Sequence, residues 1–267
     1  MSGSKLKKIK IPRDQLRNPI KPRLILVLLL LLNFKWISAQ ESYNNDPAIN
    51  FALAYGYQIP GGDFADRFGS SFYLSSQVGF LNKNNWELQF DGGLLFGNQV
   101  KEDVLAPLRT LEGNIISNDR AIADIQLRAR AVYMGLNLNK TLVLSDAYPR
   151  SGIRLGFGTG FFQHKIRIQD DPQRFVPQLT DDLKKGYDRL SNGWYISQFI
   201  GYQYLANDRK LNFYAGFETR QAFTQNRRSI NVDTGLTDTK NRLDSTWGFK
   251  VGWILPFYLG FAEEIFY

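Results

Sequence analysis

The chain has 267 residues, no cysteine and a single histidine, and its formal net charge at pH 7 is +8. Without cysteine it can form no disulfide, no thiolate metal site and no lipid-modified N-terminal cysteine. Residues 1–39 carry nine of the 33 basic residues and one of the 25 acidic residues, which leaves 24 of each sign after residue 39. The excess positive charge belongs to this first segment, so the rest of the chain lacks the basic character that a nucleic-acid partner requires.

The first segment has the parts of a secretory signal peptide. A basic region runs to Arg23, the apolar run LILVLLLLL covers residues 24–32, and NFKWISAQ offers a small-residue cleavage site after Ala39. This apolar run is much shorter than the roughly 20 residues of a membrane-spanning helix. We therefore predict that residues 1–39 are a signal peptide with a long basic region and that residues 40–267 form the mature domain. An uncleaved N-terminal anchor is the alternative.

After residue 39, short segments that alternate apolar and polar residues recur between polar connections rich in Gly, Pro and Asn. There are eight of them, at residues 48–58, 72–81, 86–96, 124–138, 152–168, 194–205, 211–223 and 243–253. The connections after the first, third, fifth and seventh segments are long, those after the second and sixth are tight, and residues 139–151 are intermediate. An even number of strands with long and short connections in alternation is typical of bacterial outer-membrane barrels. We therefore predict an all-β fold, an eight-stranded antiparallel up-and-down transmembrane β-barrel with long extracellular loops and short periplasmic turns.

The two faces of the predicted strands differ in chemistry. One face is apolar and carries large aromatic residues near both strand ends, such as Trp86 and Phe96 in the third segment and Trp194 and Tyr204 in the sixth. This arrangement is typical of the aromatic girdles at the two membrane interfaces. The other face is rich in Gly, Ala, Ser and Gln, which suits a narrow interior. A soluble antiparallel barrel or sandwich with its apolar face inward is the alternative, because it produces the same alternation.

The polar face also carries charges of both signs, which we predict to form a balanced network inside the barrel. The five acids and five bases are Glu87, Asp91, Asp124, Glu218, Asp244, Arg128, Arg130, Arg154, Arg220 and Lys250. An eight-stranded barrel has room only for side chains, and buried charges need partners. The network therefore predicts a plugged lumen and favours it over an open channel. No cofactor or metal site is expected, because no spacing of His, Asp and Glu indicates one.

The fifth segment contains RLGFGTGFFQHKI, in which Gly156, Gly158 and Gly160 are spaced two residues apart. This is the period of a strand, and it differs from the G-x-G-x-x-G spacing of a dinucleotide-binding turn. We predict a smooth glycine strip on the lumen face of this strand. The strip would give space to long side chains from across the barrel, with Arg128, Arg130 and Lys250 as candidates.

His164 has the parity of this strip and lies near the predicted outer rim. Asp170, Asp171 and Ser191 are in or beside the loop that follows. A lipid-modifying enzyme with a rim site near His164 is therefore an alternative function. The favoured interpretation is a rim histidine that bonds to polar groups of the loops, because no compact motif fixes a nucleophile beside a base.

The last long loop and the C-terminal segment carry two further expectations. Arg227 and Arg228 could contact lipopolysaccharide phosphates or a partner, with a solvated surface pair as the simpler interpretation. Pro256 is expected to end the eighth strand because it cannot donate to the ladder. Extension of that strand through the C-terminal segment is the alternative.

Four features carry a resemblance to a known group: the leader end SAQ, the first loop PGGDFADRFG, the segment GWILPFY and the aromatic terminus IFY. Residues 40–267 resemble small outer-membrane β-barrel proteins of the Bacteroidetes type. These are loosely related to the OmpA transmembrane domain and OmpX-like barrels, and they include the PorT-like group linked to type IX secretion. Phe266 and Tyr267 resemble the assembly signal at the end of such barrels. No catalytic residue of a family carries over.

The resemblance implies a location in the outer membrane of a Gram-negative cell. Outer-membrane lipid and lipopolysaccharide are the implied lipid partners, and the barrel-assembly machinery is the implied partner during insertion. The expected role is non-enzymatic: the loops would dock envelope, secretion or assembly partners, and an envelope protein complex is among the expected partners. Besides the lipid-modifying enzyme, a soluble periplasmic barrel that binds a small hydrophobic ligand is an alternative.

Overall fold

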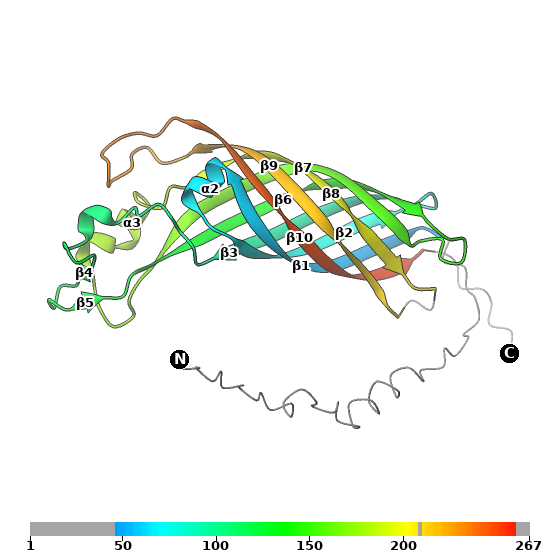
Figure 1. Cartoon of the computed structure of the whole chain (residues 1–267), viewed down its shortest axis with the longest axis horizontal. Helices are drawn as coiled ribbons and strands as arrows, with labels where there is room; N and C mark the ends of the chain where they lie inside the picture. Colours follow the sequence, from blue (N-terminus) through cyan, green and yellow to red (C-terminus); the bar gives the residue numbers. More distant parts are fainter. Residues whose placement is uncertain (1–45, 208–209, 260–267) are drawn as a thin grey trace, which may run out of the picture. The chain divides into compact units, whose positions relative to one another are not determined.

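The computed structural model describes residues 46–207 and 210–259, and these form a closed β-barrel (Figure 1). Its strands are β1 (Ala48–Gly62), β2 (Ser71–Leu81), β3 (Trp86–Gly97), β6 (Gln126–Val143), β7 (Gly152–Gln169), β8 (Ser191–Leu205), β9 (Asn212–Asn226) and β10 (Asn241–Tyr258). All neighbours are antiparallel, and β1 pairs with both β2 and β10, so the sheet has no free edge. The predicted eight-stranded up-and-down barrel is confirmed.

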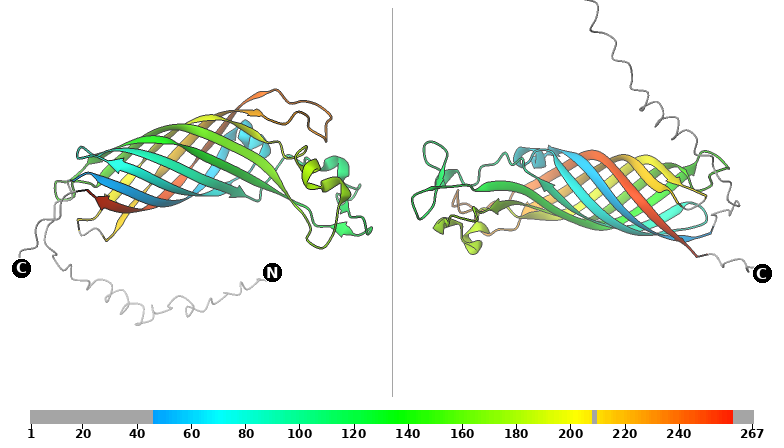
Figure 2. Two further views of the ribbon diagram at one scale, coloured as in Figure 1. Left: turned by 180° about the vertical axis from the view of Figure 1, so that it is seen from behind. Right: turned by 90° about the horizontal axis from the view of Figure 1, so that it is seen from below.

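The long connections lie at one end of the barrel and the short ones at the other (Figure 2). Residues 63–70 contain helix α2 (Asp63–Arg67), and residues 98–125 contain η1 (Ala106–Leu108), β4 (Ile115–Ile116) and β5 (Ile122–Ala123). Residues 170–190 contain η2 (Pro177–Leu179) and α3 (Asp181–Lys184), and residues 227–240 form the fourth loop. The opposite end has only residues 82–85, 144–151 and 206–211 between strands. This is the predicted layout of long extracellular loops and short periplasmic turns. No helix in the described residues is long and apolar enough to cross a membrane.

The direction of the side chains distinguishes a membrane barrel from a soluble one. Along β1, Leu53 is 64% exposed on the outside, whereas Ala52 and Ala54 are buried inside. The same alternation places large apolar side chains on the outer wall of every strand and polar or charged ones in the lumen. A soluble barrel would bury the apolar face, since exposing it to water is unfavourable. The outer wall is therefore built to contact lipid.

Strand β6 corrects one part of the predicted charge network. Arg128 and Arg130 were expected in the lumen, but they share the outward parity of Met134, which is 50% exposed on the lipid-facing wall. Ala129 and Tyr133 point inward and are buried. The prediction failed because small and aromatic residues line the lumen of this strand and were assigned to the lipid face. Asp124 was expected in the lumen as well, but it lies exposed in the loop before β6.

The end of β10 corrects a second prediction. Pro256 does not end the strand, which continues to Tyr258 and pairs Pro256 with Asn50 of β1. The pairing of β10 with β9 stops at Trp253, so the last residues of β10 have a neighbour on one side only. Proline is tolerated in such an edge position because no ladder bond is lost there. The predicted signal peptide and the terminal Phe266 and Tyr267 lie outside the described residues.

Candidate functional site

The centre of the lumen is held by a lysine between two carboxylates from other strands. Lys250 Nζ of β10 donates to Asp91 Oδ2 of β3 at 2.7 Å and to Glu218 Oε1 of β9 at 3.1 Å. Glu218 also accepts hydrogen bonds from Arg220 and from the Tyr73 hydroxyl, both at 3.1 Å. Lys250, Asp91 and Arg220 are all buried. Buried charges are tolerated when they are paired and hydrogen-bonded in this way, so the cluster connects four strands, β2, β3, β9 and β10, through the interior.

A second ion pair lies nearer the periplasmic end. Arg154 donates to Glu87 Oε2 at 2.5 Å and to Gln203 Oε1 at 2.5 Å, and Asn50 donates to Glu87 Oε1 at 2.7 Å. Arg154 and Glu87 are 2% and 3% exposed. Of the ten residues proposed for the lumen network, seven lie inside the barrel: Glu87, Asp91, Arg154, Glu218, Arg220, Asp244 and Lys250. They form separate clusters along the barrel axis, linked by uncharged polar side chains.

Four tyrosines fill the lumen between these clusters. Tyr73, Tyr133 and Tyr214 stand over Gly56, Gly93 and Gly252 of adjacent strands, and Tyr195 of β8 stands over Gly135 of β6, two strands away. A methyl group on each glycine would lie 2.2–2.5 Å from the tyrosine. The guanidinium carbon of Arg220 lies 3.8 Å from the Tyr133 ring centre and 5.1 Å from that of Tyr195, which is cation–π geometry. Sequence reasoning missed this layer. The signal is a lumen-side tyrosine that meets a glycine, and it can be read only once the strand register is known.

The space that remains at the glycine strip is small. Gly156, Gly158 and Gly160 share the inward parity of Arg154. A cavity of about 20 Å³ is lined by Gly156, Asn137 and Lys250 among others, which is room for about one water molecule. The space over Gly158 is taken by Asn137 and Ser197, and that over Gly156 by Asn139 and Phe199. Arg128 and Arg130, two of the three expected occupants, point out of the barrel instead.

His164 lies above the charged clusters and is only 1% exposed. Its Nε2 is 2.8 Å from Asp244 Oδ2, which also accepts a hydrogen bond from Thr224 at 2.5 Å. The rings of Phe64, Phe68 and Phe162 enclose the imidazole, with centroid separations of 5.1, 5.6 and 5.6 Å. The expected rim histidine is therefore a buried lumen residue that bonds to a strand carboxylate and not to loop groups.

The other groups expected beside His164 are engaged elsewhere. Ser191 is its cross-strand neighbour, but the Ser191 hydroxyl accepts from Arg67 and donates to the Arg189 carbonyl, both at 3.1 Å. Asp170 pairs with Lys184, and Asp171 accepts from the backbone N–H of Asp124. The arrangement therefore lacks the nucleophile–base hydrogen bond of a hydrolase. Within residues 46–207 and 210–259, no cluster of His, Asp and Glu could hold a metal ion.

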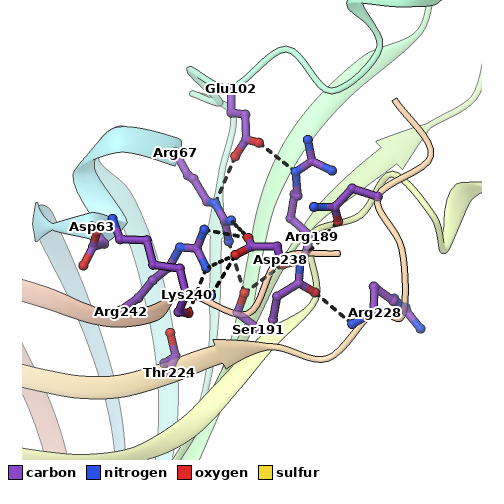
Figure 3. Close-up of polar contacts among 12 residues, drawn as sticks. Asp63, Arg67, Glu102, Arg189, Ser191, Thr224, Arg228, Asp238, Lys240 and Arg242 are labelled. Carbon is purple, nitrogen blue, oxygen red and sulfur yellow. Dashed lines mark hydrogen bonds and ion pairs between the residues drawn. The ribbon is translucent and has the colours of Figure 1, made fainter. Parts of the chain in front are cut away.

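A cap of ion pairs joins all four long loops above this level (Figure 3). Glu102 lies between two arginines: its carboxylate is 2.9 Å from Arg67 Nε of α2 and 2.7 Å from Arg189 Nε of the third loop. Arg67 also reaches Asp238 of the fourth loop at 3.5 Å. Arg189 forms a two-pronged contact with Asp233, at 2.8 and 2.6 Å. We call Arg67, Glu102, Arg189, Asp233 and Asp238 the loop cap.

Further pairs extend the loop cap toward the barrel wall. Arg242 of β10 lies 2.6 Å from Asp238, and Lys240 lies 2.7 Å from Asp63 of α2. Arg228 lies 2.6 Å from Asp188 and so bonds within the chain, as Arg227 does to Asn192 at 2.6 Å. These two arginines, proposed as rim contacts, are therefore tied to the third loop and the start of β8.

The charges of the loop cap are shifted by their surroundings. Burial lowers the pKa of Arg67, although Glu102 opposes this effect. Burial tends to raise the pKa of Asp238, but its hydrogen bond to Arg242 and its other contacts hold that pKa below the ordinary value. For Arg228, the hydrogen bond to Asp188 raises the pKa. The charged form of Asp238 is thus stabilised by the neighbouring Arg242.

The sequence of the first loop explains how the loop cap is anchored. In DFADRF, α2 points Phe64 and Phe68 down toward His164, and both rings are 1% exposed. Arg67 belongs to the same short turn and faces the ion pairs. The apolar layer continues into Leu105 and Ile166, which are also buried. The phenylalanine spacing was visible in the sequence, but the ion-pair partners of Arg67 were not, because Glu102 and Asp238 come from two other loops.

No family model and no curated protein matches this sequence. The chain is similar to solved structures of other proteins. Ail, the attachment invasion locus protein of Yersinia pestis, is 10% identical over 78% of this chain and 99% of its own, with a TM-score of 0.41. Neisserial surface protein A is 9% identical over 79% and 97%, with a TM-score of 0.42. The N-terminal β-barrel domain of Pseudomonas aeruginosa OprF is 9% identical over 77% and 96%, with a TM-score of 0.34.

The chain is similar to small outer-membrane β-barrels. At these identities the likeness concerns the fold alone.

Proposed function

We propose that this chain is a non-enzymatic integral barrel of the cell outer membrane whose loops dock another protein of the envelope. The observation that carries the proposal is a lumen filled by paired charges and tyrosines beneath loops held by ion pairs. The lumen cavity near Lys250 holds about 20 Å³, room for about one water molecule, which supports a plugged lumen. An ion-paired cap gives the loops a fixed shape, and a fixed shape favours recognition because little ordering is needed on binding.

The loops also present apolar side chains to solvent. Leu111 of the second loop is fully exposed, while Phe175 of the third and Leu236 of the fourth are 57% and 68% exposed. These residues lie beyond the strands that contact lipid, so the bilayer does not cover them. Exposed apolar groups among charged ones are typical of protein contact surfaces. They support an envelope protein as the partner.

The resemblance to Bacteroidetes-type barrels of the PorT-like group supports a secretion or assembly complex as the class of partner. As further partners we propose outer-membrane lipid and lipopolysaccharide around the wall, and the barrel-assembly machinery during insertion. We propose that Arg227 and Arg228 hold the loops in shape, because their side chains bond to Asn192 and Asp188 of the same chain.

Photo-crosslinking in cells tests the docking role. A photoreactive residue at Leu236 or Phe175 should form a discrete adduct with an envelope protein. The same residue at Asp146, exposed in a short turn at the other end, is the matched control. Adducts of equal yield from all three positions, or none from the loops, would contradict docking through the loops.

Fractionation tests the location separately. The protein should sediment with the outer membrane and migrate differently on gels before and after heating. Recovery in the soluble fraction with normal migration would contradict the membrane location.

A further inference from the structure

The outer wall carries a cluster of positive charges on two neighbouring strands. Arg128 of β6 is the cross-strand partner of Arg167 of β7, and Arg130 is the partner of Lys165. All four have the outward parity of their strands; Lys165 and Arg167 are exposed, and the two β6 arginines are half-buried. Like charges placed directly opposite each other destabilise an antiparallel pair unless a counter-charge is present. We call these four residues the wall cluster.

The chain supplies no such counter-charge to the wall cluster. Arg128 donates to the amide oxygens of Gln169, at 3.4 Å, and Gln126, and Arg130 donates to the Ala129 carbonyl at 2.8 Å. In the part of the chain that the structure describes, none of the four makes an ion pair. Of the acids nearest in sequence, Asp124 accepts from Gln126 and Asp170 pairs with Lys184. The loop cap is the opposite case, since its arginines all have carboxylate partners.

The position of the wall cluster indicates what could supply the missing charge. Val132 and Met134 continue the outward row of β6 below Arg130, and Phe96 of β3 is the cross-strand partner of Arg130. Two residues along a strand span about 7 Å, so the arginines lie just beyond the lipid-facing belt on the loop side. A membrane-spanning barrel meets the lipid headgroups just beyond its lipid-facing belt.

A groove runs along the wall at this depth. It is open to the surface and has a volume of about 340 Å³, and its lining includes Phe72, Phe96, Arg128, Arg130, Asn98 and Gln169. One part of the lining is therefore aromatic and continuous with the lipid-facing wall, while the other part is basic and polar. Such a groove fits a molecule with an acyl part and an anionic part.

We propose that this groove, with Lys165 and Arg167 beside it, binds the phosphate of a phosphorylated glycolipid of the outer leaflet. The two guanidinium groups donate to the phosphate oxygens, which match the planar fork of arginine, and the acyl chains pack against Phe72 and Phe96. The bound phosphate relieves the repulsion between the two cation pairs. The inference rests on the proposed outer-membrane location, but it uses residues outside the loop cap and the exposed apolar loop residues.

The test is glycolipid binding by the full-length barrel in detergent micelles, measured by native mass spectrometry. The probes are purified lipopolysaccharide and the same material after enzymatic removal of its phosphates. The double variant Arg128→Gln/Arg130→Gln should bind the phosphorylated form about tenfold more weakly, the scale expected for loss of charge-assisted hydrogen bonds. The control Lys83→Gln/Lys140→Gln removes the same charge at the periplasmic end of the barrel and should bind as the wild type does. A second double variant, Lys165→Gln/Arg167→Gln, repeats the test if the first fails to fold, and gel migration before and after heating reports folding.

Three outcomes would overturn the proposal: equal binding of the phosphorylated and dephosphorylated glycolipid, equal loss in the control, or displacement of the glycolipid by inorganic phosphate at low millimolar concentration. The last outcome would assign the site to free phosphate. Failure of the docking role would appear in the loop crosslinks, and failure of the location in fractionation. Neither result changes the binding that is read from the purified barrel, so the failures can be told apart.

Discussion

Lys250 Nζ and Asp91 Oδ2 lie 2.7 Å apart across the lumen, on strands β10 and β3, which are not neighbours in the sheet. Backbone hydrogen bonds hold only adjacent strands, so this contact connects two distant parts of the wall through the interior. Such a contact fixes which strands face each other across the lumen. Lys250 also donates to Glu218 of the adjacent strand β9.

We expect Asp91→Asn to destabilise the barrel by about 3–5 kcal/mol, because it leaves Lys250 buried with part of its charge uncompensated. The free energy of unfolding can be measured by urea titration in lipid vesicles, with tryptophan fluorescence as the signal. Asp146→Asn removes the same charge from an exposed turn and should change stability very little. The exchange Asp91→Lys/Lys250→Asp should recover part of the loss. An Asp91→Asn barrel as stable as the wild type would contradict this account of the lumen.

The glycine strip predicts a contrast between two glycines. Gly158→Leu should impair folding, because even the first carbon of a side chain there would lie 1.7 Å from Asn137 Oδ1 and 2.7 Å from Ser197 Oγ. Gly92→Leu should fold, since a carbon added at Gly92 meets nothing closer than 3.8 Å. The folded fraction of each variant, read from gel migration before and after heating, checks the contrast. Equal folding of both variants would contradict the position of the glycine strip on the lumen face of β7.

The loop cap predicts a dependence on acid. The pKa values of Asp238 and Asp63 lie below the ordinary aspartate value of 3.8, mainly because Arg242 and Lys240 bond to their charged forms. A carboxylate with a lowered pKa stabilises the folded state above its unfolded pKa, and this contribution is lost as pH falls through the folded pKa. The fourth loop should therefore stay ordered at pH 7 and open below about pH 4, near the unfolded value.

Limited proteolysis of residues 227–240 at several pH values checks this loop prediction. Arg242→Gln should shift the onset of cleavage to higher pH, while Arg109→Gln, in the second loop, should leave it unchanged. If cleavage does not change between neutral and acidic pH, protonation of these carboxylates does not open the fourth loop. The strands should resist cleavage throughout, because their backbone groups are paired on both sides over most of their length.

The sequence was sufficient for the barrel because period-two alternation, connection lengths and aromatic girdles all report on one physical constraint, a wall with lipid on one side. For the same reason, the sequence was sufficient to predict that the side chains of Glu87, Arg154 and Lys250 face the lumen. It failed for β6, where Ala129 and Tyr133 are apolar yet line the lumen, so polarity no longer identified the inner face. Hydropathy cannot assign a strand once it extends beyond the bilayer, where arginines are tolerated on the outer wall.

The contacts between elements could not be predicted, because they depend on register and on the path of the loops. Tyr73 meets Gly56 only through the offset of β1 and β2. Arg67 meets Glu102 only because the first and second loops fold over the same opening. Neither relation leaves a spacing pattern in the chain, whereas the strands do.

His164 provides the last prediction, which separates a structural role from catalysis. His164→Ala removes the partner of Asp244 Oδ2 and leaves that carboxylate buried with Thr224, so it should destabilise the barrel by about 1–3 kcal/mol. The lipid A and phospholipid profile of a strain carrying His164→Ala should equal that of the wild type, as should the profile of a deletion strain. A changed profile in both strains would instead indicate a lipid-modifying enzyme, in which case Asp244→Asn should reproduce the change. Since the imidazole is enclosed by Phe64, Phe68 and Phe162, we expect an effect on stability and none on the lipids.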